Sequence, residues 1–185
     1  NHAHPSVEVL RTERLVLRHL TPDDADFIHE LVNDRDWLRY IGDRGVRTVD
    51  DARAYIERGP MAMYTERGFG LYCVTLRDSG EPIGICGILK RDTLEEVDLG
   101  FALLPAFRSR GYAFEAAAAT IEHERRAHGL TRIVAIVSQE NQISQTLLAK
   151  LGFAFERTIQ LASGAAALAL YAIEGTASTA GRSQP

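Results

Sequence analysis

The sequence feature that most limits the fold is a charged, glycine-containing junction between an apolar segment and a long alanine-rich segment. The apolar run VDLGFALLP (97–105) ends at a proline and has the composition of a buried strand. The next segment (109–129) is typical of a helix that ends at Gly129. A second apolar run, RIVAIVS (132–138), follows it. This order predicts a strand–helix–strand crossover with the two strands parallel in one sheet.

The other periodic segments predict antiparallel strands and further helices around this crossover. Thr21-Pro22 and Thr48 each precede an acidic residue in the pattern of a helix start. Gly59-Pro60 predicts an interruption of the second of these helices, after which MAMYTERG (61–68) can resume a helix. The fold class is therefore α/β with a mixed, largely antiparallel twisted sheet. Further strands are expected at 14–20, 69–77, 82–91, 95–104, 153–161 and 165–174, and a last helix at 141–152, with Asn141 as its cap and Gly152 as its stop.

Length and charge limit the domain organisation and the partners. The 185 residues suit one domain, which we expect at 11–174, with a flexible N-terminus at 1–10 and a disordered tail at 175–185. The net charge of −4 gives no support to nucleic-acid binding. No run approaches the ~18 apolar residues of a membrane span, and the first residues lack a signal-peptide pattern. We expect a cytoplasmic protein without a membrane or nucleic-acid partner.

The two cysteines, Cys73 and Cys86, both lie in apolar strand-like runs. Two cysteines make a poor disulfide framework and have no metal-ligand spacing, and no His, Cys and Asp set in the chain has it either. We interpret them as buried thiols in a reducing compartment, and we expect no metal.

The junction itself, FRSRGYAFEA (107–116), has the composition of an anion-binding site. A helix start exposes unpaired backbone N–H groups and the positive end of the helix dipole. Arg108 and Arg110 add positive charge, and Gly111 lets the backbone approach a ligand without a Cβ in the way. We therefore expect a phosphate cradle at this point, where mixed α/β sheets tend to bind ligands.

Four segments together give the chain a resemblance to a known family. Arg108 to Ala113 match the R/Q-x-x-G-x-G/A signature, and VDLGFALLP is similar to the strand that precedes it. NQISQTLLAKLGF (141–153) is similar to an N-x-x-S…K-L-G-F segment, and TERLVLRHLTPDDA (12–25) to an opening strand and helix. One short motif is weak evidence, but these four occur in order over residues 11–174. The chain resembles the RimJ/RimL-like branch of the GNAT acyltransferase superfamily.

The resemblance implies a GNAT fold and an N-acetyltransferase that uses acetyl-CoA and releases CoA. It also implies that the strand after the long helix splays away from its neighbour and leaves a slot, which a bulge near Gly100 would fit. The pantetheine arm would lie in this slot against the backbone of Phe101, Ala102 and Leu103, with Asn141 in contact. The pyrophosphate would bind the backbone N–H groups of Arg108, Ser109, Arg110, Gly111, Tyr112 and Ala113, and the arginine side chains would add charge.

Acetyl transfer also needs a group that takes a proton, because amines are mostly protonated at neutral pH. Asp98 and Glu96 lie on the strand that leads to the junction and share one face at a period of two. We rank Asp98 first, because the RimJ/RimL-like pattern often has an acidic residue at its position. A backbone N–H near Phe101 or Ala102 would stabilise the oxyanion.

The group that assists the leaving thiolate is harder to assign. Many GNAT enzymes have a tyrosine before K-L-G-F, and this chain has Leu148 there. RimJ/RimL-like members have a serine at the N-x-x-S position, which is Ser144 here. Its hydroxyl can donate a hydrogen bond to a thiolate, although it is a weak acid.

Several alternatives remain open from the sequence. The acceptor is a protein N-terminus or a small amine, and the protein is a monomer or a homodimer. A non-catalytic acyl-CoA-binding sensor or scaffold with the same fold is a second interpretation. A third is an anion-binding fold for a nucleotide other than CoA.

Overall fold

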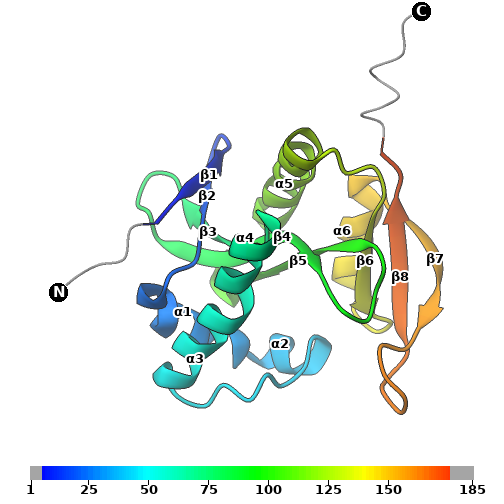
Figure 1. Ribbon diagram of the computed structural model, residues 1–185, viewed down its shortest axis with the longest axis horizontal. Helices are drawn as coiled ribbons and strands as arrows, with labels where there is room; N and C mark the ends of the chain where they lie inside the picture. Colours follow the sequence, from blue (N-terminus) through cyan, green and yellow to red (C-terminus); the bar gives the residue numbers. More distant parts are fainter. Residues whose placement is uncertain (1–5, 176–185) are drawn as a thin grey trace, which may run out of the picture.

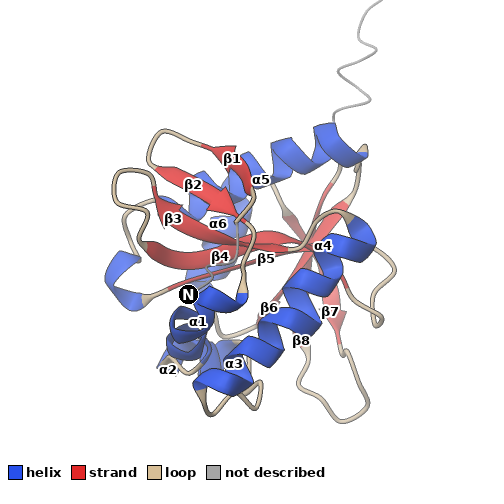
Figure 2. Ribbon diagram, turned by 60° about the vertical axis from the view of Figure 1, so that its left-hand side comes forward, coloured by secondary structure: helices blue, strands red, loops and turns tan. Residues whose placement is uncertain are grey.

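The computed structural model describes residues 6–175, which form a twisted eight-stranded sheet with helices on both faces (Figures 1 and 2). The predictions for residues 1–5 and 176–185 lie outside this range. The strands are β1 Glu8–Arg11, β2 Leu15–Arg18, β3 Leu71–Leu76, β4 Pro82–Lys90, β5 Val97–Leu103, β6 Ile133–Ser138, β7 Ala154–Ile159 and β8 Leu168–Ile173. The helices are α1 Ala25–Val32, α2 Arg35–Tyr40, α3 Val49–Ile56, α4 Ala62–Arg67, α5 Tyr112–His128 and α6 Gln142–Leu151.

The strand order across the sheet is β1-β2-β3-β4-β5-β6-β8-β7. Every neighbouring pair of the described strands is antiparallel except β5 and β6, which are parallel and joined through α5. The predicted mixed sheet with one parallel crossover is therefore confirmed. The carboxyl ends of β5 and β6 consequently lie at the same edge of the sheet.

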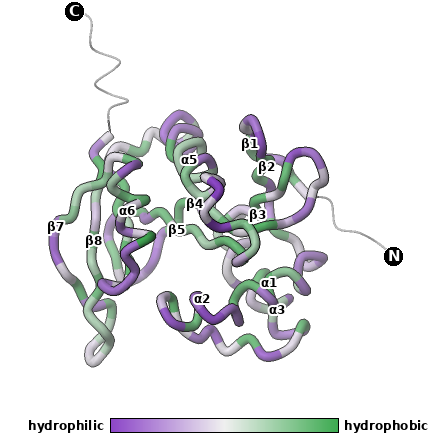
Figure 3. The backbone as a smooth tube through the Cα atoms, turned by 180° about the vertical axis from the view of Figure 1, so that it is seen from behind, coloured by the Kyte–Doolittle hydropathy of each residue, from purple (hydrophilic) through white to green (hydrophobic). Residues whose placement is uncertain are grey.

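Side chains of the central strand β5 alternate between two apolar cores. Leu99 and Leu103 pack in the core that contains Ile121 of α5. Ala102 faces the opposite core, which contains Ile28 of α1 and residues of α3. Figure 3 shows the contrast between the hydrophobic strand β8 and the hydrophilic helix α2. Because both faces are covered, the central strands are apolar along their length.

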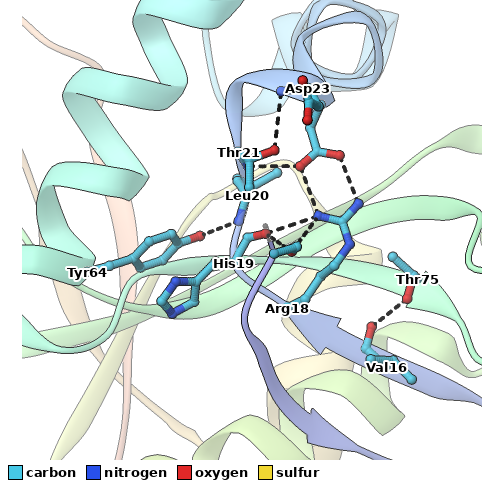
Figure 4. A network of polar contacts seen from close by, with 10 residues as sticks. Val16, Arg18, His19, Leu20, Thr21, Asp23, Tyr64 and Thr75 are labelled. Atoms are coloured by element: carbon cyan, nitrogen blue, oxygen red, sulfur yellow. Dashed lines mark hydrogen bonds and ion pairs between the residues drawn. The ribbon is translucent and has the colours of Figure 1, made fainter. Parts of the chain in front are cut away.

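The strand predicted at 14–20 is β2, and a further strand, β1, precedes it. Glu8 to Arg11 pair with β2, so residues 8–10 are part of the sheet and not of a flexible terminus. The predicted cap at Thr21 is present, and it begins a short 3-10 turn ahead of α1. Asp24 in that turn binds Arg18 of β2 at 2.8 Å, and Figure 4 shows this network.

The helix that begins after Thr48 is not interrupted at Gly59-Pro60. The chain passes through a π-helical turn, Glu57–Met61, and continues as α4 to a left-handed Gly68. A wider turn accommodates the proline ring and its missing N–H, so the helix axis continues. Among residues 6–175, no helix is both long and apolar enough to cross a membrane.

Candidate active site

The predicted slot would lie between β5 and β6, whose ladder is short. The two strands share a single registered pair, Asp98 with Val134, near their amino ends. β6 instead pairs with β8 along its whole length. The pairing of β5 with β4 runs without a register shift, so the bulge expected near Gly100 is absent. The predicted slot would therefore come from the divergence of β6 toward its carboxyl end.

The backbone groups that face this slot follow from the alternation of an antiparallel ladder. The N–H of Leu104 donates to the carbonyl of Ile83 at 2.8 Å, one residue past the pair of Leu103 with Gly84. Even-numbered residues of β5 therefore bond to β4, and Phe101 and Leu103 direct their N–H groups toward β6. Ala102 is among the even-numbered residues, so its backbone is used within the sheet.

The predicted cradle lies at the carboxyl end of β5. No N–H group from Ser109 to Phe114 donates to a protein acceptor within the described residues; the first that does is Glu115, which donates to the Gly111 carbonyl at 3.1 Å. Ser109 and Gly111 have left-handed φ angles of 65° and 86°. Turns of this kind gather N–H groups into an anion-binding concavity, and the N-terminus of α5 adds its dipole. The arrangement fits a phosphate group.

The side chain of Arg108 does not contribute to the cradle. Its guanidinium binds Asp34 at 2.6 Å and Asp36 at 2.8 Å, and its Nε donates to the Leu103 carbonyl. The expectation that both arginines add charge at the cradle is corrected for this residue. Arg110 is exposed and has no ion pair among the described residues, so its charge remains available to an anion.

Arg14, which lies near the start of the chain, contacts the same loop, and the sequence did not predict this contact. Arg14 donates to the Arg110 carbonyl at 3.1 Å, binds Glu115 at 2.7 Å, and lies 4.4 Å from the centre of the Tyr112 ring. Partial burial opposes ionisation of Glu115, but hydrogen bonds from Thr12 and Arg14 hold the pKa of its carboxyl below the usual range. The only sequence signal for this contact was the acidic Glu115 in the first turn of α5.

Asp98 is fully buried at the amino end of the slot. Its Oδ1 binds Arg91 Nε at 3.0 Å, and its Oδ2 has no hydrogen-bond partner among the described residues. Burial raises the pKa of this carboxyl, and the positive charge of Arg91 opposes the shift. Asp98 is thus a more basic carboxylate than an exposed one.

The structure does not bring Glu96 to Asp98. Glu96 precedes the first residue of β5, so the period-two rule does not extend to it. Its carboxylate binds Arg132, which also binds Glu156 and Glu174 at 2.8 and 2.6 Å. This network links the start of β5, the start of β6, strand β7 and the end of β8. Its role is therefore structural.

Asn141 and Ser144 lie after β6, at the same sheet edge as the cradle. The Asn141 Oδ1 accepts the Ser144 N–H at 3.1 Å, which is the predicted helix cap. The Ser144 hydroxyl has no hydrogen-bond partner among the described residues, and Leu148 is fully buried in the core. A residue missed from the sequence, Tyr171 of β8, donates its hydroxyl to Gln145 at 2.8 Å.

A strand with a parallel neighbour that pairs at one position, followed by a cradle of free N–H groups, is the arrangement that the resemblance to the GNAT superfamily implies. A family model described as an acetyltransferase (GNAT) domain matches residues 14–154. The chain belongs to this family and is an acetyl-CoA-dependent N-acetyltransferase. Membership favours an enzyme over the non-catalytic module and the binder of other nucleotides.

Relatives and solved structures agree with this assignment. The chain is 29% identical over 153 residues to the uncharacterized N-acetyltransferase YoaA of Bacillus subtilis (strain 168), covering 82% of this chain and 86% of YoaA. It is 26% identical to the structure of an acetyltransferase from Agrobacterium tumefaciens str. C58, with a TM-score of 0.76 and coverage of 94% and 96%. The ribosomal L7/L12 acetyltransferase RimL, described in complex with coenzyme A, shares the fold at 18% identity, with a TM-score of 0.77 and coverage of 92% and 99%. The likeness to RimL shows a shared fold.

Proposed function

We propose that the enzyme transfers the acetyl group of acetyl-CoA to a primary amine by direct attack within a ternary complex. The observation that carries this proposal is the position of two features at opposite ends of β5. Free N–H groups from Ser109 to Phe114 follow its carboxyl end, and the buried carboxylate of Asp98 lies at its amino end. The pyrophosphate would bind the free N–H groups, and the amine would meet the Asp98 carboxylate.

The backbone of β5 orients the donor between these ends. The outward N–H groups of Phe101 and Leu103 are suited to hydrogen bonds with the pantetheine arm. We assign the polarisation of the thioester carbonyl to the Phe101 N–H, because Ala102 uses its own N–H within the sheet. The Asn141 side-chain amide, at the same sheet edge, is the further contact to the arm.

Asp98 accepts the proton that the amine loses on attack. The new bond joins the amine nitrogen to the acetyl carbon, and the carbon–sulfur bond breaks. The raised pKa of Asp98 brings its basicity closer to neutral pH, which favours a general base. The Ser144 hydroxyl, without a protein partner among the described residues, donates a hydrogen bond to the departing thiolate.

No acyl-enzyme is required. Cys73 and Cys86 are buried free thiols, and burial raises the pKa of each to about 12. A thiol with such a pKa holds almost no thiolate at neutral pH, and the thiolate is the nucleophilic form. Both cysteines therefore serve as core residues, as the sequence predicted.

A thermal-shift experiment with CoA, acetyl-CoA and ATP, followed by an amine screen, tests the proposal. A ligand at about 100 times its Kd should stabilise the fold by about 2.7 kcal/mol, a shift of a few degrees for a chain of this size. We expect both CoA species to raise the melting temperature and ATP to leave it unchanged. Stabilisation by ATP alone, or acetyl-CoA bound without turnover of any amine, would contradict the proposal.

A further inference from the structure

A cavity of about 350 Å³ lies beside α3, outside the slot and the cradle. Its walls come from α3, from the turn after α3 and from the loop that joins α2 to α3. This volume is at the small end for ligand sites and suits a group of amino-acid size. The lining residues are Arg44, Gly45, Val46, Asp51, Ala54, Tyr55, Arg58 and Gly59.

Two arginines of this cavity have no carboxylate partner. Neighbouring arginines are paired, Arg47 with Asp43 and Arg53 with Asp50, whereas Arg44 and Arg58 have no ion pair among the described residues. Two guanidinium groups that line one small cavity repel each other, and an anion between them removes that repulsion. The cavity therefore favours a negatively charged group.

The single carboxylate in the lining does not satisfy these arginines. Asp51 accepts hydrogen bonds from the N–H groups of Arg47 and Thr48, at 2.9 and 3.1 Å, as part of the cap of α3. Its Oδ2 is thus directed to the start of the helix, and no ion pair joins Asp51 to Arg44 or Arg58 among the described residues. The positive charge of the cavity remains, although the whole chain has a net charge of −4.

Tyr55 links the cavity to the proposed base. Its side chain lines the cavity, and burial raises the pKa of its hydroxyl, while the guanidinium groups of Arg44 and Arg91 oppose that shift. Both guanidinium groups therefore act on one hydroxyl. Arg91 in turn binds the Asp98 carboxylate at 3.0 Å. Arg44 of the cavity and Arg91, the partner of Asp98, thus both influence the Tyr55 hydroxyl.

We propose that this cavity holds the anionic group of the acceptor, so that the acceptor is a small amine that also carries a carboxylate or a phosphate. This inference rests on the proposed function. The anion binds Arg44 and Arg58, and the amino group points toward Asp98. A small acceptor, rather than a protein N-terminus, follows from the size of the cavity.

Matched pairs of acceptors test this inference. A panel of amino acids and their carboxamides, and phosphoethanolamine with ethanolamine, varies the anion and keeps the amine. Turnover with acetyl-CoA and calorimetric binding to the CoA-loaded protein are both measured. We expect the anionic member of at least one pair to be preferred about tenfold or more, as charge-assisted hydrogen bonds allow. The carboxylate and phosphate arms distinguish the two anions.

Variants assign the preference to the cavity. Arg44→Ala with Arg58→Ala should remove the preference by raising KM for the anionic acceptor, with the neutral acceptor and CoA binding unchanged. Arg53→Ala is the matched control, because Arg53 lies on α3, which forms a wall of the cavity, but is paired with Asp50 and does not line the cavity. Equal use or equal binding of the anionic and neutral members would overturn the inference. An equal loss of the preference in the Arg44→Ala, Arg58→Ala double variant and in the Arg53→Ala control would also overturn it. Absence of CoA binding is the separate outcome that refutes the proposed function.

Discussion

The carboxylate of Asp98 is held between two opposing influences. Full burial disfavours its charge, and Arg91 at 3.0 Å favours it. The net effect raises the pKa above the ordinary value of 3.8. A carboxylate in this state is costly for folding and useful for proton transfer, which is the balance expected of a catalytic base.

Asp98→Asn should lower kcat about 100-fold or more, the usual scale for loss of a general base. CoA affinity should not change, because the cradle lies at the other end of β5. The pH profile of the wild type should contain a limb that rises as Asp98 loses its proton, with an apparent pKa above 3.8, and this limb should be absent from the variant. Unchanged kcat and an unchanged profile would exclude Asp98 as the base.

Glu96→Gln should behave as a structural change only. Glu96 shares Arg132 with Glu156, so Glu156→Gln is the matched control from the same network. We expect both variants to retain kcat within about threefold and to lower the melting temperature slightly, because exposed ion pairs contribute little. A selective loss of kcat in Glu96→Gln would restore this residue as a candidate base.

At the scale of secondary-structure elements, Arg108 fastens α2 to the loop between β5 and α5. Partial burial of Asp34 opposes ionisation, but the hydrogen bond and charge of Arg108, with two backbone N–H groups, hold the pKa of Asp34 below 3.8. A carboxyl whose pKa is lower in the folded protein than in the unfolded chain stabilises the fold at pH values above the unfolded pKa. That contribution is lost as the pH falls below about 4.

Arg108→Ala should therefore cost about 1 kcal/mol at neutral pH, after allowance for solvent screening of this partly exposed pair. The difference between variant and wild type should shrink in acid, because Arg108 stabilises only the ionised form of Asp34 and protonation removes that stabilisation. Denaturant unfolding at pH 7 and pH 3 measures this. An equal loss at both values would mean that the ion pairs are not the source, and that Arg108 stabilises the loop through packing.

The elements were predictable where local chemistry decides them. The Thr21, Thr48 and Asn141 caps and the glycine stops at Gly129 and Gly152 all depend on neighbours within a few residues. The continuation through Pro60 runs against the local preference of proline, and the pairing of Glu8–Arg11 with β2 forms where a flexible terminus was predicted. Local signals cannot report such contacts.

The same distinction applies to the site across the whole molecule. The cradle was predictable because its backbone geometry is encoded by adjacent residues, Ser109 to Ala113. The contacts of the arginines at the cradle could not be predicted, because they come from distant segments. Arg108 binds Asp34 and Asp36 from α2, and Arg14 reaches the loop from the turn between β1 and β2. The cavity beside α3 likewise joins that helix to a loop whose contacts no periodic pattern reports.

The central claim is that the cradle after β5 binds the CoA pyrophosphate, and a pair of glycine substitutions tests it most directly. Gly111 and Gly164 have similar left-handed φ angles, +86° and +82°, so aspartate is equally strained at both. A Cβ at Gly111 would lie 3.2 Å from the Arg14 guanidinium and add negative charge to the cradle, whereas Gly164 has no neighbour within 4 Å.

The measurement is calorimetric titration of CoA into the wild type, Gly111→Asp and Gly164→Asp, with circular dichroism to verify folding. We predict equal affinity for the wild type and Gly164→Asp. Gly111→Asp should bind about 100-fold more weakly or not at all, because charge-assisted hydrogen bonds to the phosphate are lost. A folded Gly111→Asp protein with wild-type affinity for CoA would contradict the account.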